Sequence, residues 1–268
     1  MCRVLSVSRS GYYRWLNRGK SNRQLRRESM TEHVVDTFDT FKARYGALRI
    51  TKELNELGVS CSHNYVAGLL KAQGLRAHNG KSFNYGGHAL TMNNVFDNLL
   101  KRKFDVAKPN LKWVSDITYI WVEEQWLYLS TVMDLFSRKI IGWSLDDSMS
   151  VDLIRDALKM AFKGREIAPG LIIHSDRGTQ YRSNEYIDYM RANGGKPSMS
   201  RKGNCWDNAV MESFYSRLKV EMIYPSNFSS ISELKSSIFE YIEIFYNRIR
   251  RHSANDYLSP LEFERRYA

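Results

Sequence analysis

Three β-prone runs lie close together near the middle of the chain and constrain its fold more than any other feature. They cover Trp113–Ile120, Trp126–Met133 and Ile140–Leu145, and β-branched and aromatic residues are frequent in all three. Because only a few residues separate one run from the next, neighbouring strands are joined by hairpins rather than by long crossovers. The sequence therefore predicts a three-stranded antiparallel meander.

Helices and strands alternate after this meander. A helix capped by Ser150 carries its apolar residues at helical spacing, on the face formed by Leu153, Ile154, Ala157, Leu158 and Ala161. The elements predicted beyond it are strands at Leu171–Ser175 and near Lys196–Met199, and helices at Asn184–Asn193, Asp207–Met222 and Ile231–Arg251. Three hairpin-connected strands followed by strands that alternate with helices indicate an α+β fold. Its sheet would be mixed, with parallel and antiparallel strands, and flanked by helices.

The first hundred residues contain no proline, which is typical of a helical region because proline breaks helix interiors. A long polar helix is predicted at Ser21–Phe41, with Val34, Val35, Phe38 and Phe41 on one face. Two shorter helices follow, the first with Leu48, Thr51, Leu54 and Leu57 on its packed face and Gly58 as its stop.

The second short helix is capped by Ser60 or Ser62, buries Val66, Leu69 and Leu70, and ends near Gly74. Two such helices predict a helix-turn-helix at about 45–74, although a hairpin that merely packs in a small bundle has the same pattern. The second helix would be the recognition helix, and its candidate DNA contacts are Ser62, Asn64, Tyr65 and Lys71.

Positive charge is concentrated in the same region. The chain has a net charge of +11, and residues 1–100 contribute +8 of it, from 15 basic and 7 acidic side chains. A localised basic excess is typical of nucleic-acid binding, although a solvated basic surface has the same composition. No apolar run reaches the roughly 18–20 residues that a membrane span needs. The three cysteines are far apart, so we expect no zinc or disulfide framework, and a reducing cytoplasm.

Three carboxylates form the candidate catalytic set. Asp116 lies inside a predicted strand, where aspartate is unusual, and Asp176 follows a short apolar strand. Glu212 lies on a predicted helix, with 35 residues between it and Asp176. Taken singly, they are better explained as a solvent-facing aspartate, a turn cap and a helix-surface glutamate. Together they suit phosphodiester transfer, in which two Mg²⁺ ions about 3.5–4 Å apart activate the nucleophile and stabilise the leaving oxygen.

Residues around Glu212 are candidates for DNA contact. Asn208 and Lys219 fall on the helix face of Glu212, and Arg201 and Lys202 precede the helix. Tyr215 is suited either to stacking on a base or to core packing.

Two further side chains have competing interpretations. His174 is either a nucleophile or ligand, or a strand-end histidine that packs or forms hydrogen bonds. Asp134 is either a fourth metal carboxylate or the residue that fixes the following turn.

Several segments resemble those of transposases of the insertion-sequence-three family, specifically the second reading-frame product with its retroviral-integrase-like core. The segments are Trp113–Ile120, Met133–Arg138, His174–Tyr181, Ser200–Phe214, Phe245–Asn247, Arg251–Ser253 and Leu258–Pro260. The helix-turn-helix, from Tyr45-Gly46 to Gly74, is also family-like, and Ala254-Asn255-Asp256 departs from the expected apolar, glycine-containing stretch.

The resemblance implies a ribonuclease-H-like core that uses Mg²⁺, with Mn²⁺ as a substitute, for cleavage and joining of double-stranded DNA at the ends of a mobile element. It also implies a homo-oligomer on DNA and fusion or association with an upstream reading-frame product. The expected organisation is a helical DNA-binding region at 1–75, a linker at 76–108, a catalytic core at 109–222 and a C-terminal helical extension at 223–268. The alternatives are a transposon-derived DNA-binding regulator with an inert core, and a general nuclease.

Overall fold

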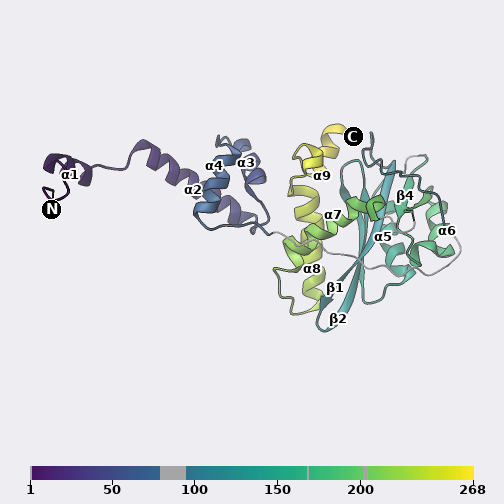
Figure 1. The fold of residues 1–268 in the computed structure, drawn as a ribbon. Helices are drawn as coiled ribbons and strands as arrows, with labels where there is room; N and C mark the ends of the chain where they lie inside the picture. The colour runs from purple at the N-terminus through teal and green to yellow at the C-terminus, as the bar shows by residue number, and fades with distance from the viewer. Residues whose placement is uncertain (1, 79–94, 168, 202–204) are drawn as a thin grey trace. The chain divides into compact units, whose positions relative to one another are not determined.

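The computed structural model describes residues 2–78, 95–167, 169–201 and 205–268. The chain forms two compact units, Met1–His78 and Asn79–Ala268, which are considered separately here (Figure 1). The middle of the predicted linker at 76–108 lies outside the described residues. No helix among the described residues is long and apolar enough to cross a membrane.

The first unit is helical, as predicted. Its helices are α1 (Arg9–Leu16), α2 (Asn22–Thr40), α3 (Ala47–Glu56) and α4 (His63–Ala72). A capping box formed by Ser21 and Gln24 begins α2. Helix α1 was not predicted, and it buries none of its residues, so no apolar face marks it in the sequence.

Helices α2, α3 and α4 share a small core. Its buried residues are Met30, Val34, Phe38, Ile50, Thr51, Leu54, Val66, Leu69 and Leu70. The predicted face of α3 was partly wrong, because Leu48 and Leu57 are 54% and 72% exposed while Ile50 is buried. Leu57 is the C-cap of α3, and Gly58 follows it with φ +81°, so the chain turns before Leu57 can continue the helical face.

The second unit is built on a five-stranded mixed sheet with the order β3-β2-β1-β4-β5 (Figure 1). The predicted antiparallel meander is confirmed in β1 (Lys112–Val122), β2 (Gln125–Asp134) and β3 (Lys139–Asp146). Strand β4 (Ile172–Ser175) pairs in parallel with β1 on one side, and with β5 (Lys196–Met199) on the other. The ribonuclease-H-like mixed sheet expected from the sequence is present.

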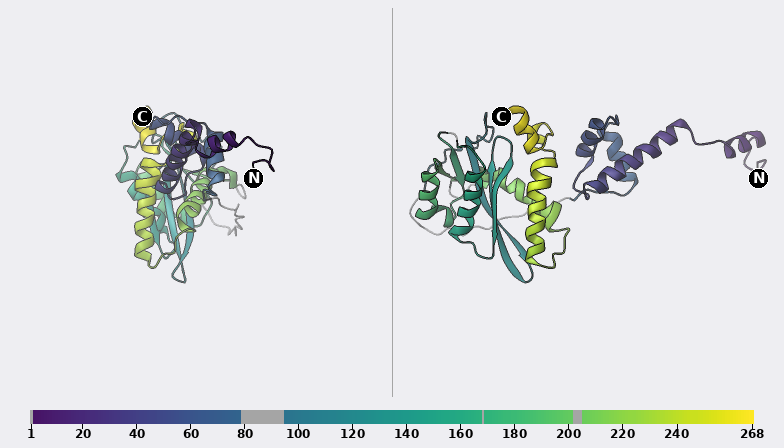
Figure 2. Two further views of the ribbon diagram at one scale, coloured as in Figure 1. Left: turned by 90° about the vertical axis from the view of Figure 1, so that its left-hand side faces the viewer. Right: turned by 180° about the vertical axis from the view of Figure 1, so that it is seen from behind.

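Helices cover both faces of this sheet (Figures 1 and 2). On one face, α5 (Val151–Lys163) and α6 (Asn184–Ala192) pack on the sheet through a core that includes Trp113, Val132, Ile154 and Ile173. A side chain at Gly142 of β3 would clash with the backbone of Ala157, so glycine allows α5 to approach closely. The buried face of α5 is the one predicted.

The opposite face carries two long helical segments that change their winding along their length. The predicted helix at Asp207–Met222 comprises η2 (Cys205–Asn208), α7 (Ala209–Leu218) and the π-helical η3 (Lys219–Ile223). The predicted helix at Ile231–Arg251 comprises α8 (Ile231–Phe239) and the π-helical η4 (Glu240–Ile249).

Three short elements were not predicted. They are η1 (Gln180–Arg182), η5 (Ser253–Asn255) and α9 (Pro260–Tyr267). Helix α9 joins the sheet through Glu264, which accepts hydrogen bonds from Ser137, Lys139 and Arg165.

Candidate active site and nucleic-acid interface

Sheet register places Asp116 and Asp176 beside each other. In the parallel pair of β1 and β4, Val114 pairs with His174, and each aspartate lies two residues beyond its paired residue. Strands in a sheet are about 4.8 Å apart, so the two aspartates lie at the same level, Asp116 inside β1 and Asp176 just past the end of β4. Asp176 stands at the carboxyl end of β4, where ligand sites of such sheets gather.

The three carboxyl groups share one electrostatic environment. Burial raises the pKa of Asp116 well above its usual range, and the nearby charges of Asp176 and Glu212 add to the rise. The backbone N–H of Ile117 donates to Asp116 Oδ1 at 2.9 Å and partly opposes the shift. Glu212, on α7, is half-buried, and burial also raises its pKa. The Asp116 carboxyl is thus within electrostatic range of both Asp176 and Glu212.

Asp176 is held by the turn that follows it. The backbone N–H of Gly178 donates to Asp176 Oδ1 at 2.8 Å. The residue is exposed, but partial desolvation of its carboxyl raises its pKa, while Gly178 and Arg182 act in the opposite direction. Among the described residues, no three His, Cys, Asp or Glu side chains are grouped closely enough to hold a metal ion as they stand.

Two buried tyrosines tie the other two carboxylate segments to β1. Tyr215, one helical turn after Glu212, donates its hydroxyl to the Asp116 carbonyl oxygen at 2.6 Å and lies 2.8 Å from Thr131 Oγ1. Tyr181, in the segment after Asp176, places its hydroxyl 3.1 Å from Ser115 Oγ. Tyr215 is 2% exposed, so of its two sequence-based interpretations the structure favours core packing.

For the DNA cleavage that the sequence predicts, Tyr215→Phe should slow the reaction about tenfold to a hundredfold while DNA binding stays unchanged. The variant keeps the buried ring but removes the hydrogen bond that connects α7 to the Asp116 backbone. Small displacements of catalytic groups slow reactions by factors of this size. Turnover and apparent KM for DNA are to be measured separately. Tyr241→Phe is the matched control, because it removes another buried hydroxyl bond, 2.9 Å to Glu221 Oε2. An equal loss of turnover in both variants contradicts a positioning role.

The proposed DNA contacts near Glu212 have different surroundings. Lys219 places its ammonium 4.6 Å from the centroid of the half-exposed Tyr119 ring, and desolvation lowers its pKa. Asn208 is only 6% exposed, and its Oδ1 has no partner within the described residues. Arg201 is exposed, and Lys202 lies outside the described residues. Of the three described side chains, those of Lys219 and Arg201 are therefore more accessible than that of Asn208.

A buried Asp207 organises the segment before α7, and sequence reasoning missed it. Arg201 donates to it through its backbone N–H at 3.0 Å and through its guanidinium, and the side chains of Asn98 and Arg102 donate at 2.8 and 2.9 Å. These bonds, those of Arg201 foremost, hold the pKa of Asp207 well below its usual range. Asn98 and Arg102 lie more than a hundred residues away, so no local pattern predicts the cluster.

His174 and Asp134 both have structural surroundings. His174 is buried between the hydroxyls of Ser198 and Ser200, at 2.8 and 3.1 Å, and burial lowers its pKa to about 4. It is therefore neutral at neutral pH. Asp134 accepts backbone N–H bonds from Phe136 and Asn110, at 3.0 and 2.8 Å, which supports its interpretation as a turn-fixing residue.

In the first unit, the candidate DNA contacts lie along the accessible side of α4. Ser62 caps the helix by accepting the backbone N–H of Tyr65 at 3.4 Å. Ser62, Asn64, Tyr65 and Lys71 are all exposed, whereas Val66 and Leu69 are buried against the neighbouring helices. The structure thus leaves this side of the predicted recognition helix open.

Comparison with known proteins agrees with this architecture. Residues 24–82 match an HTH-like domain, and residues 106–205 and 212–267 match two integrase core domain models. The chain is similar in fold to a chain of the simian T-cell lymphotropic virus intasome, with a TM-score of 0.51, 14% sequence identity, and coverage of 87% of this chain and 73% of that one.

Two curated transposases are similar over almost their whole length. Transposase InsF for insertion sequence IS3A of Escherichia coli is 44% identical, covering 98% of this chain and 92% of InsF. The transposase for insertion sequence element IS904 of Lactococcus lactis is 41% identical, covering 93% of this chain and 99% of its own length. With an integrase-like core and a helix-turn-helix-like unit in one chain, the protein is a DNA transposase and belongs to the family of insertion sequence IS3.

Proposed function

We propose that Asp116, Asp176 and Glu212 are the catalytic carboxylates of this transposase and that they bind divalent metal, as two Mg²⁺ ions for which Mn²⁺ can substitute. The observation that carries the proposal is the parallel register of β1 and β4, with Asp116 and Asp176 at matching positions. The effect of the Asp176 and Glu212 charges on the Asp116 pKa supports it. We assign the chemistry to the 109–222 region.

The residues present fit a hard cation. All three donors are carboxylate oxygens, which Mg²⁺ prefers. Burial raises the pKa of all three carboxyl groups, which disfavours three negative charges without a counter-charge and so supports binding of a cation there. Asp116 is the candidate for contacting both ions, because the strand interior holds it most rigidly.

The chemistry proceeds by two attacks on phosphorus. In cleavage, water attacks a phosphodiester at the element end and a 3′-hydroxyl leaves. In joining, that 3′-hydroxyl attacks a target phosphodiester, and the 3′-oxygen of the cut target strand leaves. Bound metal would activate the attacking oxygen and offset charge on the leaving oxygen. The three carboxylates, from two strands and one helix, would hold the cation that binds the reacting phosphate, and Tyr215 and Tyr181 keep those segments in place.

The proposed substrate is double-stranded DNA, as element ends and as target. The +8 charge of residues 1–100 and the open side of α4 support terminal-repeat binding by the first unit. We further propose a homo-oligomer on DNA and association with an upstream reading-frame product. The regulator alternative is not favoured, because the chain retains all three carboxylates together with the integrase-like core.

Incubation of the protein with labelled element ends tests this function. We expect nicked ends, and then joined strands, with Mg²⁺ or Mn²⁺. Ca²⁺, which tolerates looser coordination, is expected to support binding but little chemistry. Equal cleavage in the presence of a chelator would count against metal-dependent transfer.

Lys219 is proposed to position DNA rather than metal. Its ammonium lies over an exposed aromatic ring, on the helical segment that continues from Glu212. We expect Lys219→Ala to weaken binding of element ends severalfold, and joining at limiting DNA with it, while the Mg²⁺ dependence stays unchanged. Arg217→Ala is the matched control, since it removes an exposed cation two residues away. Unaltered end binding by Lys219→Ala is the contrary result.

A further inference from the structure

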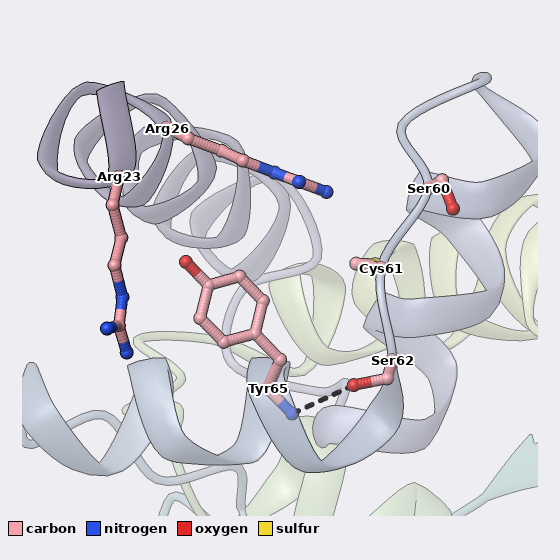
Figure 3. Close-up of a pocket in the computed structure, with 6 residues that line it drawn as sticks. All are labelled: Arg23, Arg26, Ser60, Cys61, Ser62 and Tyr65. Carbon is pink, nitrogen blue, oxygen red and sulfur yellow. Dashed lines mark hydrogen bonds between the residues drawn. The ribbon is translucent and has the colours of Figure 1, made fainter.

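A basic pocket lies between α2 and the start of α4, within the first unit (Figure 3). Its volume is about 510 Å³. The lining residues are Arg23 and Arg26 from α2, Ser60, Cys61 and Ser62 from the turn before α4, and Tyr65 from α4. Figure 3 shows the Tyr65 ring between the two arginine side chains. The two arginines were not among the residues expected to contact DNA.

Hydrogen bonds hold the wall of the pocket opposite the arginines. Asn55 of α3 accepts the backbone N–H of Cys61 at 2.9 Å and donates to its carbonyl oxygen at 3.2 Å. Ser62 caps α4 through the backbone N–H of Tyr65. The segment before α4 and the first helical turn of α4 are therefore fixed before any ligand binds. This pre-organisation lowers the entropic cost of binding.

The side chains that line the pocket are cationic and rich in hydrogen-bond donors. No acidic side chain lines the pocket, and in the described part of the chain neither Arg23 nor Arg26 forms an ion pair, whereas nearby Lys20 pairs with Glu28 at 2.6 Å. Two guanidinium groups, with the hydroxyls of Tyr65 and Ser60, surround one space. A guanidinium group can donate two parallel hydrogen bonds to two oxygens of a phosphate. The pocket is therefore suited to bind a phosphate-type oxyanion.

The exposure of the lining favours a polymer over a free nucleotide. Pockets for small molecules bury most of the ligand surface. Here both arginines, Ser60, Ser62 and Tyr65 are exposed, and Tyr65 is 37% accessible. Such a surface can accept one phosphate of a strand whose remainder stays outside. The pocket also adjoins the end of α4 that carries Ser62 and Asn64, the end through which a recognition helix contacts bases.

We propose that Arg23, Arg26 and Tyr65 form a clamp for a backbone phosphate of duplex DNA, through which α2 positions α4 on its site. The clamp rests on the proposed DNA-binding function of the first unit. Because every phosphate is alike, its contribution is independent of sequence, and α4 supplies the discrimination.

The test uses the full chain with Arg23→Gln and Arg26→Gln combined. Binding of an element-end duplex and of an unrelated duplex is measured by fluorescence anisotropy over a range of salt concentrations. We expect affinity to fall about tenfold or more, and by the same factor, on both duplexes. Loss of the one phosphate contact that the two arginines share should reduce the slope of log K against log salt by about 0.9. Arg27→Gln is the matched control, because Arg27 is exposed on the same helix but does not line the pocket.

Three outcomes would overturn the clamp. They are an unchanged salt slope, an equal loss in Arg27→Gln, and tight binding of inorganic phosphate or a mononucleotide that the double variant abolishes without changing duplex affinity. Retention of most of the slope by Arg23→Lys with Arg26→Lys, at reduced affinity, would support it, because charge remains while the fork is lost. The measurement requires no catalysis. A failed clamp is therefore distinguishable from failed carboxylate chemistry, which is read as strand cleavage at saturating DNA.

Discussion

Asp116→Asn, Asp176→Asn and Glu212→Gln are each expected to abolish both DNA cleavage and strand joining, by at least about a thousandfold. Each substitution keeps the shape of the side chain and removes one negative charge from the proposed metal site, and both reactions need the same ligands. Because residues that act as a unit are not additive, the double variants should be little worse than the single ones.

Strand cleavage and joining by each purified variant are the measurements, with DNA binding and thermal unfolding followed in parallel. Binding should persist, because duplex affinity is assigned to the first unit. Asp147→Asn is the matched control, since it neutralises an exposed carboxylate that follows β3. Near-normal activity in any one of the three variants removes that residue from the site.

Arg250→Ala is expected to cause the largest loss of stability, about 3–5 kcal/mol. Arg250 and Glu221 are buried and joined by two hydrogen bonds, of 2.6 and 2.9 Å, and Tyr241 donates to the same carboxylate at 2.9 Å. Removing the guanidinium leaves a buried negative charge without its cation. For a unit of this size the expected fall in melting temperature is on the order of 10 °C.

Differential scanning calorimetry of the variant measures this loss. Arg248→Ala, which removes an exposed cation of η4, should leave the melting temperature nearly unchanged. Replacing both partners, with Glu221→Met and Arg250→Met, should recover much of the stability, because an apolar pair carries no unpaired charge. A single Arg250→Ala variant as stable as the Arg248→Ala control would show that the ion pair contributes little.

Local patterns determined most of the elements of this protein. The period of apolar residues predicted the meander and the buried face of α5, because side chains two residues apart share a strand face and those three or four apart share a helix face. Elements were predicted less accurately where the apolar periodicity is weak. The exposed α1 shows no apolar face, and the last turn of α3 placed Leu57 outside the helix.

The residue types of the candidate site were also readable from the sequence. Of the three carboxylates only Asp116, inside a β-prone run, is an unusual residue for its position, but the set of two aspartates and a glutamate predicted one chemistry. Reading them as one site required the resemblance to known motifs as well, because spacing along a chain does not specify distance in space.

Only the tertiary structure decided how these residues meet. The parallel register of β1 with β4 brings Asp116 level with Asp176 although sixty positions separate them, and Tyr215 connects the Glu212 helix to the Asp116 backbone. The same holds for the ion pair of Arg250 and for the pocket between Arg23 and Tyr65. Side-chain periodicity specifies which face an element buries; partner, register and distance depend on packing between elements, which no local pattern encodes.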